Sequence, residues 1–201
     1  MTTPLDILTP DEVRALIDAT SSRAPTGRRN RALLVALYRG GLRLTEALAL
    51  GPGDLDLAEG RIRVAGRSEA TARSIGVDLQ AAALIGEWAQ ARATLGLADA
   101  APFFCTLQGE PIKDAYIRAL LPRLAAAAGV PKRVHASGLR AAHALELASE
   151  GFPLRVLQEH LGIESLAATQ RYLERFRSVD AIRALQTREW SLGATPAQAT
   201  Q

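Results

Sequence analysis

Residues 61–78 break the pattern of an otherwise helical chain of 201 residues, and this break limits the folds open to it. Residues 61–64 alternate polar and apolar side chains, as a half-buried strand does, and residues 74–77 are a second short candidate. Residues 66–72 between them predict a hairpin loop. Segments rich in Ala and Leu on both sides favour helices. The sequence therefore predicts a mainly α domain with a small antiparallel β insert, an α+β fold.

Start and stop signals divide the remaining chain into helices. Thr9, Pro10 and Glu12 form one start signal: a Thr cap, Pro in the first turn and Glu three residues after the cap. Gly129 and Gly162 mark breaks. The expected helices span residues 10–19, 28–39, 45–50, 79–95, 112–129, 139–150, 153–161, 166–175 and 178–190.

Composition and length favour one domain over residues 1–190, followed by a flexible tail over residues 191–201. No apolar run reaches about 18 residues, so a membrane span is not expected. The first residues lack a basic stretch followed by an apolar one, so no secretory signal is evident. Cys105 is the single cysteine and has no internal disulfide partner. We therefore expect a cytoplasmic protein.

The basic residues are strongly biased towards arginine. Of 24 basic residues, only Lys113 and Lys132 are lysines. Arginine presents a planar fork that pairs bidentately with phosphate, although a GC-rich genome would produce the same bias. The net charge of +3 and the pI near 9.5 permit nucleic-acid binding without requiring it.

Three short motifs carry the chemistry. Arg43 lies within the segment GGLRLTE at residues 40–46, and Arg140 ends the triplet Gly-Leu-Arg. Tyr172 closes residues 161–172, which begin with Leu-Gly and end with Thr-Gln-Arg-Tyr. Two guanidiniums and one phenol suit the task of gripping a phosphodiester while a tyrosine attacks it.

In this order, with a hairpin between the first two, these motifs resemble those of the tyrosine recombinase (phage integrase) catalytic domain, over about residues 8–190. The family is related to type IB topoisomerases. The resemblance implies that Tyr172 attacks a DNA phosphate, forms a 3′-phosphotyrosyl bond and releases a 5′ hydroxyl, without a metal or other cofactor. Arg43 and Arg140 would face the non-bridging oxygens. Arg67 occupies the position of a hairpin lysine that the family associates with protonating the departing oxygen.

The sequence departs from the family at each position linked to proton transfer. Arg67 replaces the lysine, and arginine holds its proton too tightly to be an easy general acid. Ser137 replaces a His three residues before Arg140, with His135 two residues earlier. Ile163 replaces a His or Trp nine residues before Tyr172. One lost general acid or base typically costs about 10²–10⁴ in rate. We therefore expect a degenerate active site with weakened or lost cleavage, and leave open whether the protein is an enzyme.

Further residues are expected to contact DNA phosphates or to support the site. Arg171, Arg175 and Arg177 either follow the DNA backbone or form a solvated charged surface, and the scattered His and Cys residues give no metal-ligand spacing. The predicted DNA-binding residues are Arg43, Arg67, Arg73, Lys132, Arg133, His135, Ser137 and Arg140.

Other polar residues receive more ordinary interpretations. We expect Tyr38 and Tyr116 to be packing residues. His143 lies three residues after Arg140 on the same helix face and is interpreted as structural, although it could substitute for the missing His. His160 is expected to face solvent, and Glu46 to orient Arg43.

Three functions follow from these patterns. The first is a DNA-binding accessory or regulatory protein of recombinase descent, and the second is an active minimal site-specific recombinase or integrase. The third is a helical interaction domain whose arginines serve only solubility. Fewer than ten residues precede the first expected helix, so the N-terminal DNA-clamping domain of many relatives is expected to be absent. Double-stranded DNA is the expected partner, with a homo-oligomer or a partner recombinase completing the assembly. Residues 178–190 resemble the family's segment that packs on a neighbouring protomer.

Overall fold

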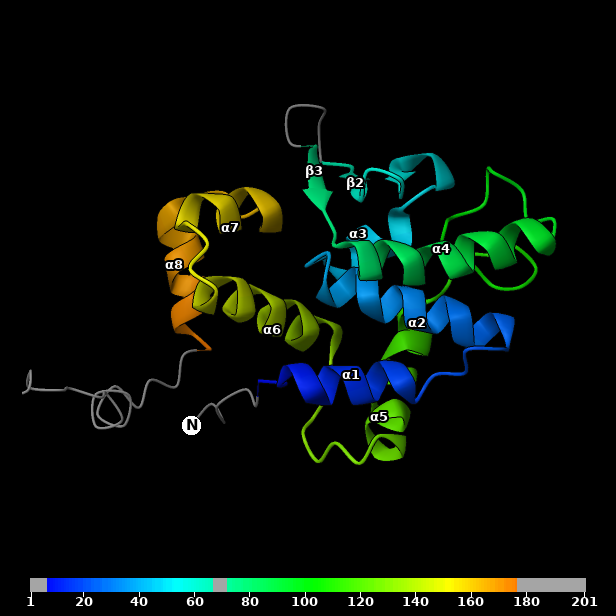
Figure 1. Cartoon of the computed structure of the whole chain (residues 1–201), viewed down its shortest axis with the longest axis horizontal. Helices are drawn as coiled ribbons and strands as arrows, with labels where there is room; N and C mark the ends of the chain where they lie inside the picture. The colour runs from blue at the N-terminus through cyan, green and yellow to red at the C-terminus, as the bar shows by residue number, and fades with distance from the viewer. Residues whose placement is uncertain (1–6, 67–71, 177–201) are drawn as a thin grey trace, which may run out of the picture.

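The structure is a computed structural model, and it describes residues 7–66 and 72–176. Helices dominate this part of the chain, with one small sheet between α3 and α4 (Figure 1). The elements in chain order are α1 (Pro10–Asp18), α2 (Pro25–Tyr38), α3 (Leu44–Ala49), a 3-10 turn (Pro52–Asp54), β1 (Leu55–Asp56), β2 (Arg61–Val64), β3 (Arg73–Gly76), α4 (Leu79–Thr94), α5 (Asp114–Ala127), α6 (Ala136–Ser149), α7 (Leu154–Leu161) and α8 (Leu166–Glu174).

The predicted start of α1 is confirmed in atomic detail. The Thr9 Oγ1 accepts a hydrogen bond from the Glu12 amide at 3.2 Å, and the Glu12 carboxylate accepts one from the Thr9 amide at 2.7 Å. Such a reciprocal box satisfies two amides that have no partner within the helix. By contrast, α2 begins at Pro25, three residues before the expected start, because proline is well suited to the first turn.

Helix α2 lies at the centre of the main core. Residues 32–38 are all buried, and the helix packs against α1, α3, α4 and α6. Full burial of a large apolar side chain contributes roughly 1.5–3 kcal/mol. The helix is therefore a fixed platform, and the turn that follows it delivers Arg43 to the start of α3. Gly41 makes this turn with a φ of 58°, a conformation that favours glycine.

The β insert is confirmed as an antiparallel sheet of order β1-β2-β3. Ile62 pairs with Leu55 on one side and Ile75 on the other. Ile62, Val64 and Ile75 are buried, whereas the arginines between them face outward. Strand β1 was not predicted, because two residues are too few to show alternation. Arg67 and most of the predicted hairpin loop lie outside the described residues.

Helices α6, α7 and α8 form a second, smaller core beside the first. Its buried members are Ala144, Leu157, Leu161 and Leu173. Figure 1 shows α7 and α8 together at one end of the molecule, and α7 also contacts β3. The segments that carry the three motifs therefore meet where the two cores adjoin.

Several expected boundaries moved. Helix α6 begins at Ala136 rather than residue 139, so His135 is its cap residue and Ser137 lies in its first turn. Cys105, in the segment left ambiguous, forms an isolated bridge with Pro111 and is a free, buried cysteine. The expected helix over 178–190 and the tail over 191–201 lie outside the described residues. Among the helices described, none has the length and apolar character needed to cross a membrane.

Candidate functional site

One open cavity of about 740 Å³ brings the three motif residues together. Arg43 comes from the residue before α3, Arg140 from the second turn of α6, and Tyr172 from α8. These positions are separated by up to 129 residues in sequence. The cavity is lined by Arg43, Arg140, Ile163, Ala168, Arg171, Tyr172, Glu174 and Arg175.

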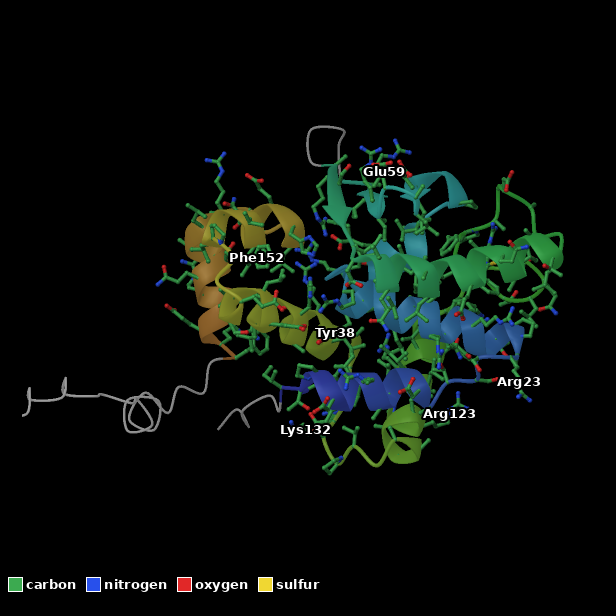
Figure 2. The ribbon with its side chains drawn as sticks, in the orientation of Figure 1. Arg23, Tyr38, Glu59, Arg123, Lys132 and Phe152 are labelled. Atoms are coloured by element: carbon green, nitrogen blue, oxygen red, sulfur yellow. The ribbon has the colours of Figure 1, made fainter. Side chains whose placement is uncertain are left out.

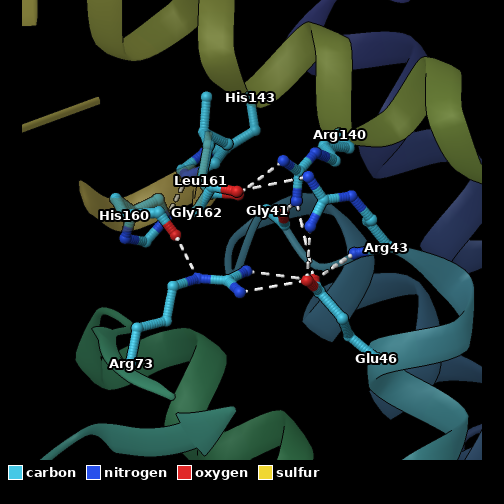
Figure 3. A network of polar contacts seen from close by, with 9 residues as sticks. All are labelled: Gly41, Arg43, Glu46, Arg73, Arg140, His143, His160, Leu161 and Gly162. Atoms are coloured by element: carbon cyan, nitrogen blue, oxygen red, sulfur yellow. Dashed lines mark hydrogen bonds and ion pairs between the residues drawn. The ribbon is translucent and has the colours of Figure 1, made fainter. Parts of the chain in front are cut away.

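Glu46 holds the arginines of this site in place (Figure 3). Its carboxylate accepts hydrogen bonds from Arg43 Nη1 at 2.6 Å and from both terminal nitrogens of Arg73 at 3.0 Å each. Arg140 Nη1 lies 3.6 Å from the same carboxylate. Burial alone would raise the pKa of Glu46, but Arg73 and Arg43 lower it to about 2. Glu46 therefore orients Arg43 as predicted, and it also links Arg43 to Arg73 and Arg140.

The end of α7 supplies a second set of partners for the same arginines. The last carbonyls of a helix lack partners within the helix and lie at the negative end of its dipole. Three successive carbonyls here each accept a hydrogen bond from a different guanidinium (Figure 3). The pairs are His160 O with Arg73 Nε at 3.0 Å, Leu161 O with Arg140 Nη2 at 2.6 Å, and Gly162 O with Arg43 Nη2 at 3.2 Å.

Gly162 allows this close approach. It ends α7 in the left-handed conformation, with a φ of 59°. A Cβ atom at this position would lie 2.7 Å from the Arg73 guanidinium carbon. Glycine is therefore required both by the backbone conformation and by the guanidinium packed against it.

Arg140 is the most buried cation of the cavity, with 5% of its surface exposed. Its Nη1 donates to the Gly41 carbonyl and its Nη2 to the Leu161 carbonyl, both at 2.6 Å. Burial and the neighbouring charge of Arg43 lower the pKa of Arg140, but a guanidinium keeps its charge in proteins. The arrangement presents a fixed positive charge at the floor of an open cavity.

The Tyr172 side chain is half-buried beside the Arg140 guanidinium. Burial raises the pKa of its phenol, and the positive charges of Arg140 and Arg43 oppose that rise. The ring of Phe176 packs edge-on against it at 5.1 Å. At neutral pH the phenol is therefore protonated and would need a proton acceptor before it could attack.

The structure does not bring all of the predicted DNA-binding residues to this cavity. Lys132 Nζ donates to the Ile7 carbonyl and to Glu12, both at 2.8 Å, beside the start of α1 (Figure 2). Arg133 and Ser137 are exposed, and neither lines the cavity. His135 is half-buried, where burial and the charge of Arg133 lower its pKa. The contact of these four residues with DNA remains a prediction.

The expectation that His160 faces solvent is wrong. Its Nε2 lies 3.0 Å from His143 Nε2, and His143 is buried. The sequence placed His143 near Arg140 but gave no sign of this pair, because its members lie on different helices. Tyr38 and Tyr116 do pack as predicted, and each hydroxyl also forms hydrogen bonds, to Glu146 for Tyr38 and with two side chains of α2 for Tyr116. Within residues 7–66 and 72–176, no group of three or more His, Cys, Asp or Glu side chains is placed to hold a metal ion.

Known proteins are similar to this chain in sequence and in fold. The phage integrase family matches residues 6–178. Tyrosine recombinase XerC of Pelotomaculum thermopropionicum is 34% identical over 168 residues, which cover 81% of this chain and 55% of that protein. XerC of Thermodesulfovibrio yellowstonii is 34% identical over 170 residues, covering 82% and 56%. The chain thus spans about half the length of the curated relatives that it matches.

Solved structures give the same result for the fold. XerA recombinase superimposes with a TM-score of 0.77 at 24% identity, covering 92% of this chain and 66% of that one. XerH site-specific recombinase, bound to palindromic difH substrate in a post-cleavage complex, gives a TM-score of 0.75 at 24% identity, covering 92% and 54%. A lambda integrase dimer bound to a COC′ core site gives 0.66 at 17% identity, covering 96% and 64%. From the family match and the identity to XerC, the chain belongs to the phage integrase family of tyrosine recombinases.

Proposed function

We propose that this protein binds double-stranded DNA through the Arg43–Arg140 cavity and cleaves it slowly or not at all, in an accessory or regulatory role. The observation that carries the proposal is that Arg43, Arg140 and Tyr172 line a single open cavity. Two guanidiniums held by a carboxylate and by main-chain carbonyls are pre-oriented for a phosphate, so little side-chain entropy is lost on binding. The solved XerH and lambda integrase structures contain DNA, which supports DNA as the ligand.

Weak cleavage follows from the lack of a histidine or lysine among the cavity-lining residues that the structure describes, where Glu174 is the one carboxylate. Ile163, whose side chain cannot exchange a proton, occupies a wall of the cavity near Tyr172. Each missing general acid or base slows a reaction by about 10²–10⁴, although such losses do not simply add. Phosphate binding needs only the arginines and is therefore retained.

An active minimal recombinase is the second candidate. It is favoured by one specific observation: Tyr172 lies beside Arg140, so the nucleophile and the main phosphate-binding charge are both present. In either case we propose that the protein works as a homo-oligomer on DNA or beside a partner recombinase. Sedimentation of a monomer both free and on DNA would argue against a homo-oligomer.

A nicked suicide duplex separates the two candidates. The nick lets a short fragment with the 5′ hydroxyl diffuse away, so any phosphotyrosyl adduct accumulates and is visible on a denaturing gel. Because the target site is unknown, the duplexes carry a randomised core. We expect salt-sensitive binding and an adduct that forms only over hours, with Tyr172→Phe abolishing the adduct and keeping the binding.

Two results would change this conclusion. An adduct that forms within minutes and depends on Tyr172 would support the active recombinase. Failure to bind any duplex at low salt would remove the DNA proposal and leave the helical interaction domain.

A further inference from the structure

Two histidines meet behind the phosphate-binding arginines. His143 Nε2 lies 3.0 Å from His160 Nε2, and their rings are tilted with centroids 5.1 Å apart (Figure 3). His143 belongs to α6, and His160 to the last turn of α7. A hydrogen bond between two imidazoles therefore joins the two helices.

The surroundings fix which ring donates this bond. His143 Nδ1 is buried and has no hydrogen-bond partner, and a buried N–H without a partner is costlier than a buried lone pair. His143 therefore carries its hydrogen on Nε2 and donates it. His160 accepts on Nε2 and carries its own hydrogen on Nδ1, on a ring that is only half-buried. Both rings are neutral in this arrangement.

The pair lies directly behind the two carbonyls that bind Arg140. A Cβ atom on Gly41 would lie 3.0 Å from His143 Cδ2 and 3.4 Å from His160 Nε2, so both rings pack against the Gly41 backbone. The Gly41 carbonyl accepts from Arg140 Nη1. Leu161, the next residue after His160, supplies the other carbonyl. The imidazole pair therefore packs against the Gly41 backbone and is linked to the Leu161 carbonyl through the main chain of His160.

We propose that His143 and His160 are positioning residues: as a neutral pair they hold the Gly41 and Leu161 carbonyls against Arg140, and protonation of the pair releases that arginine. The effect on the Arg140 side chain is a property of the free protein. Only the consequence that DNA affinity falls in acid rests on the proposed function.

A proton on this pair would meet mostly positive charge. Protonation of His160 on Nε2 would also place an N–H opposite the N–H of His143 and break their bond. The charged and titratable groups that face the pair are Tyr38 and Arg39 of α2, Arg73 of β3, Asp78 before α4, and Arg140 of α6. Asp78 is the one acid among these, and its carboxylate already binds Arg39 at 2.8 Å.

Burial, followed by these charges, lowers the pKa of His143 to about 3 and that of His160 to about 4. An unfolded histidine titrates near 6.5, so the unfolded chain takes up protons first as the pH falls. The stabilisation from the neutral pair is thus complete above about pH 6.5 and is lost progressively towards pH 4.

The test follows the Arg140 guanidinium and both imidazoles by ¹⁵N NMR in the free protein from pH 8 to pH 3.5, a range that reaches the lowered pKa of His160. In the wild type we expect the tautomers given above, and Arg140 N–H signals that are narrow at pH 8 and broaden as the pH falls. His160→Gln places an amide oxygen near the position of Nε2, where it accepts from His143 but does not titrate. This variant should keep the Arg140 signals throughout. His160→Ala should lose them even at pH 8, and Arg155→Gln, an exposed change on α7, should match the wild type.

Duplex binding by the same proteins forms a second arm. We expect wild-type affinity to fall about twofold between pH 7.5 and pH 4, where His160 is half protonated, and that of His160→Gln to change less over the same range. Histidines that both titrate near pH 6.5, Arg140 signals that survive His160→Ala, or equal pH profiles for wild type and His160→Gln would each overturn the inference. Arg140 signals that behave as expected, without duplex binding at any pH, would overturn the proposed function and support the positioning role.

Discussion

Arg92 and Arg140 are equally buried, each with 5% of its surface exposed, and both donate to main-chain carbonyls. Arg92, near the end of α4, donates from one terminal nitrogen to Ala98 O at 2.8 Å and Ala101 O at 3.1 Å, and lies against the Phe103 ring. In the part of the chain that the structure describes, it makes no ion pair. Arg140 differs in what surrounds it: Glu46, further arginines and an open cavity.

The comparison shows that a buried guanidinium bound to main-chain carbonyls can occur in two different settings. A guanidinium that binds carbonyls secures a loop where apolar groups cover it, and we propose that it becomes a binding group where a cavity leaves one face open. Burial therefore does not identify a functional arginine. The surrounding charge and the open face do, and each can be changed separately.

Glu46 supplies a carboxylate near Arg140, whereas Arg92 has no acidic partner among the described residues. Removing this carboxylate is expected to have the largest effect. Glu46→Gln leaves neighbouring guanidiniums without a counter-charge, so we expect the free energy of unfolding at pH 7 to fall by about 3–5 kcal/mol. The folded pKa of Glu46 lies well below its ordinary value, so this contribution is full above about pH 4.5 and disappears towards pH 2. Urea denaturation of both proteins at several pH values measures it. A loss below about 1 kcal/mol at pH 7 would show that Glu46 is not the centre of the network.

The next effect concerns the structural arginine. Arg92→Ala leaves the Ala98 and Ala101 carbonyls without their donor and opens a gap beside Phe103. We expect the free energy of unfolding to fall by about 2–4 kcal/mol. Below the melting temperature, the DNA affinity should equal that of the wild type. Weaker DNA binding by a fully folded Arg92→Ala protein would contradict the assignment of a purely structural role to Arg92.

Arg140→Ala should also lower the free energy of unfolding, because the Gly41 and Leu161 carbonyls lose their donor, but unlike Arg92→Ala it should weaken DNA binding. The variant removes the fixed charge at the cavity floor, so we expect DNA affinity to fall about 10- to 100-fold, the scale of one charge-assisted contact. Fluorescence anisotropy with a labelled duplex measures this loss, with Arg92→Ala as the matched buried control. Equal affinities for the two variants would place the DNA contact elsewhere on the surface.

The smallest expected change is a gain. Ile163→His introduces an imidazole into the cavity wall beside Tyr172, where the described lining residues include no histidine or lysine. We expect the phosphotyrosyl adduct on a nicked duplex to form about tenfold faster. The double variant with Tyr172→Phe is the control and should form none. An unchanged rate would mean that another group limits cleavage.

Most of the features that could be predicted from the sequence depend on local patterns. The capping box at Thr9 and Glu12, the strand alternation at residues 61–64 and the pairing of Arg43 with Glu46 all act over a few residues. The gathering of Arg43, Arg140 and Tyr172 was predicted through the order of their motifs, and the structure brings them to one cavity.

Contacts between distant segments that lie outside these motifs could not be predicted. The Arg73 guanidinium binds Glu46 and the end of α7, 27 and 87 residues away, while its predicted contact with DNA stays a prediction. The His143–His160 pair depends on how α6 and α7 pack, and no single segment contains a signal for it. Strand β1 exists only because β2 lies beside it.

The central claim is that Arg43 and Arg140 bind DNA phosphate, and the salt dependence of binding tests it most directly. Each phosphate contact adds about 0.9 to the slope of log affinity against log salt. The double variant Arg43→Gln/Arg140→Gln should therefore lower that slope by about 2 while remaining folded. A slope and affinity equal to those of the wild type would contradict the claim.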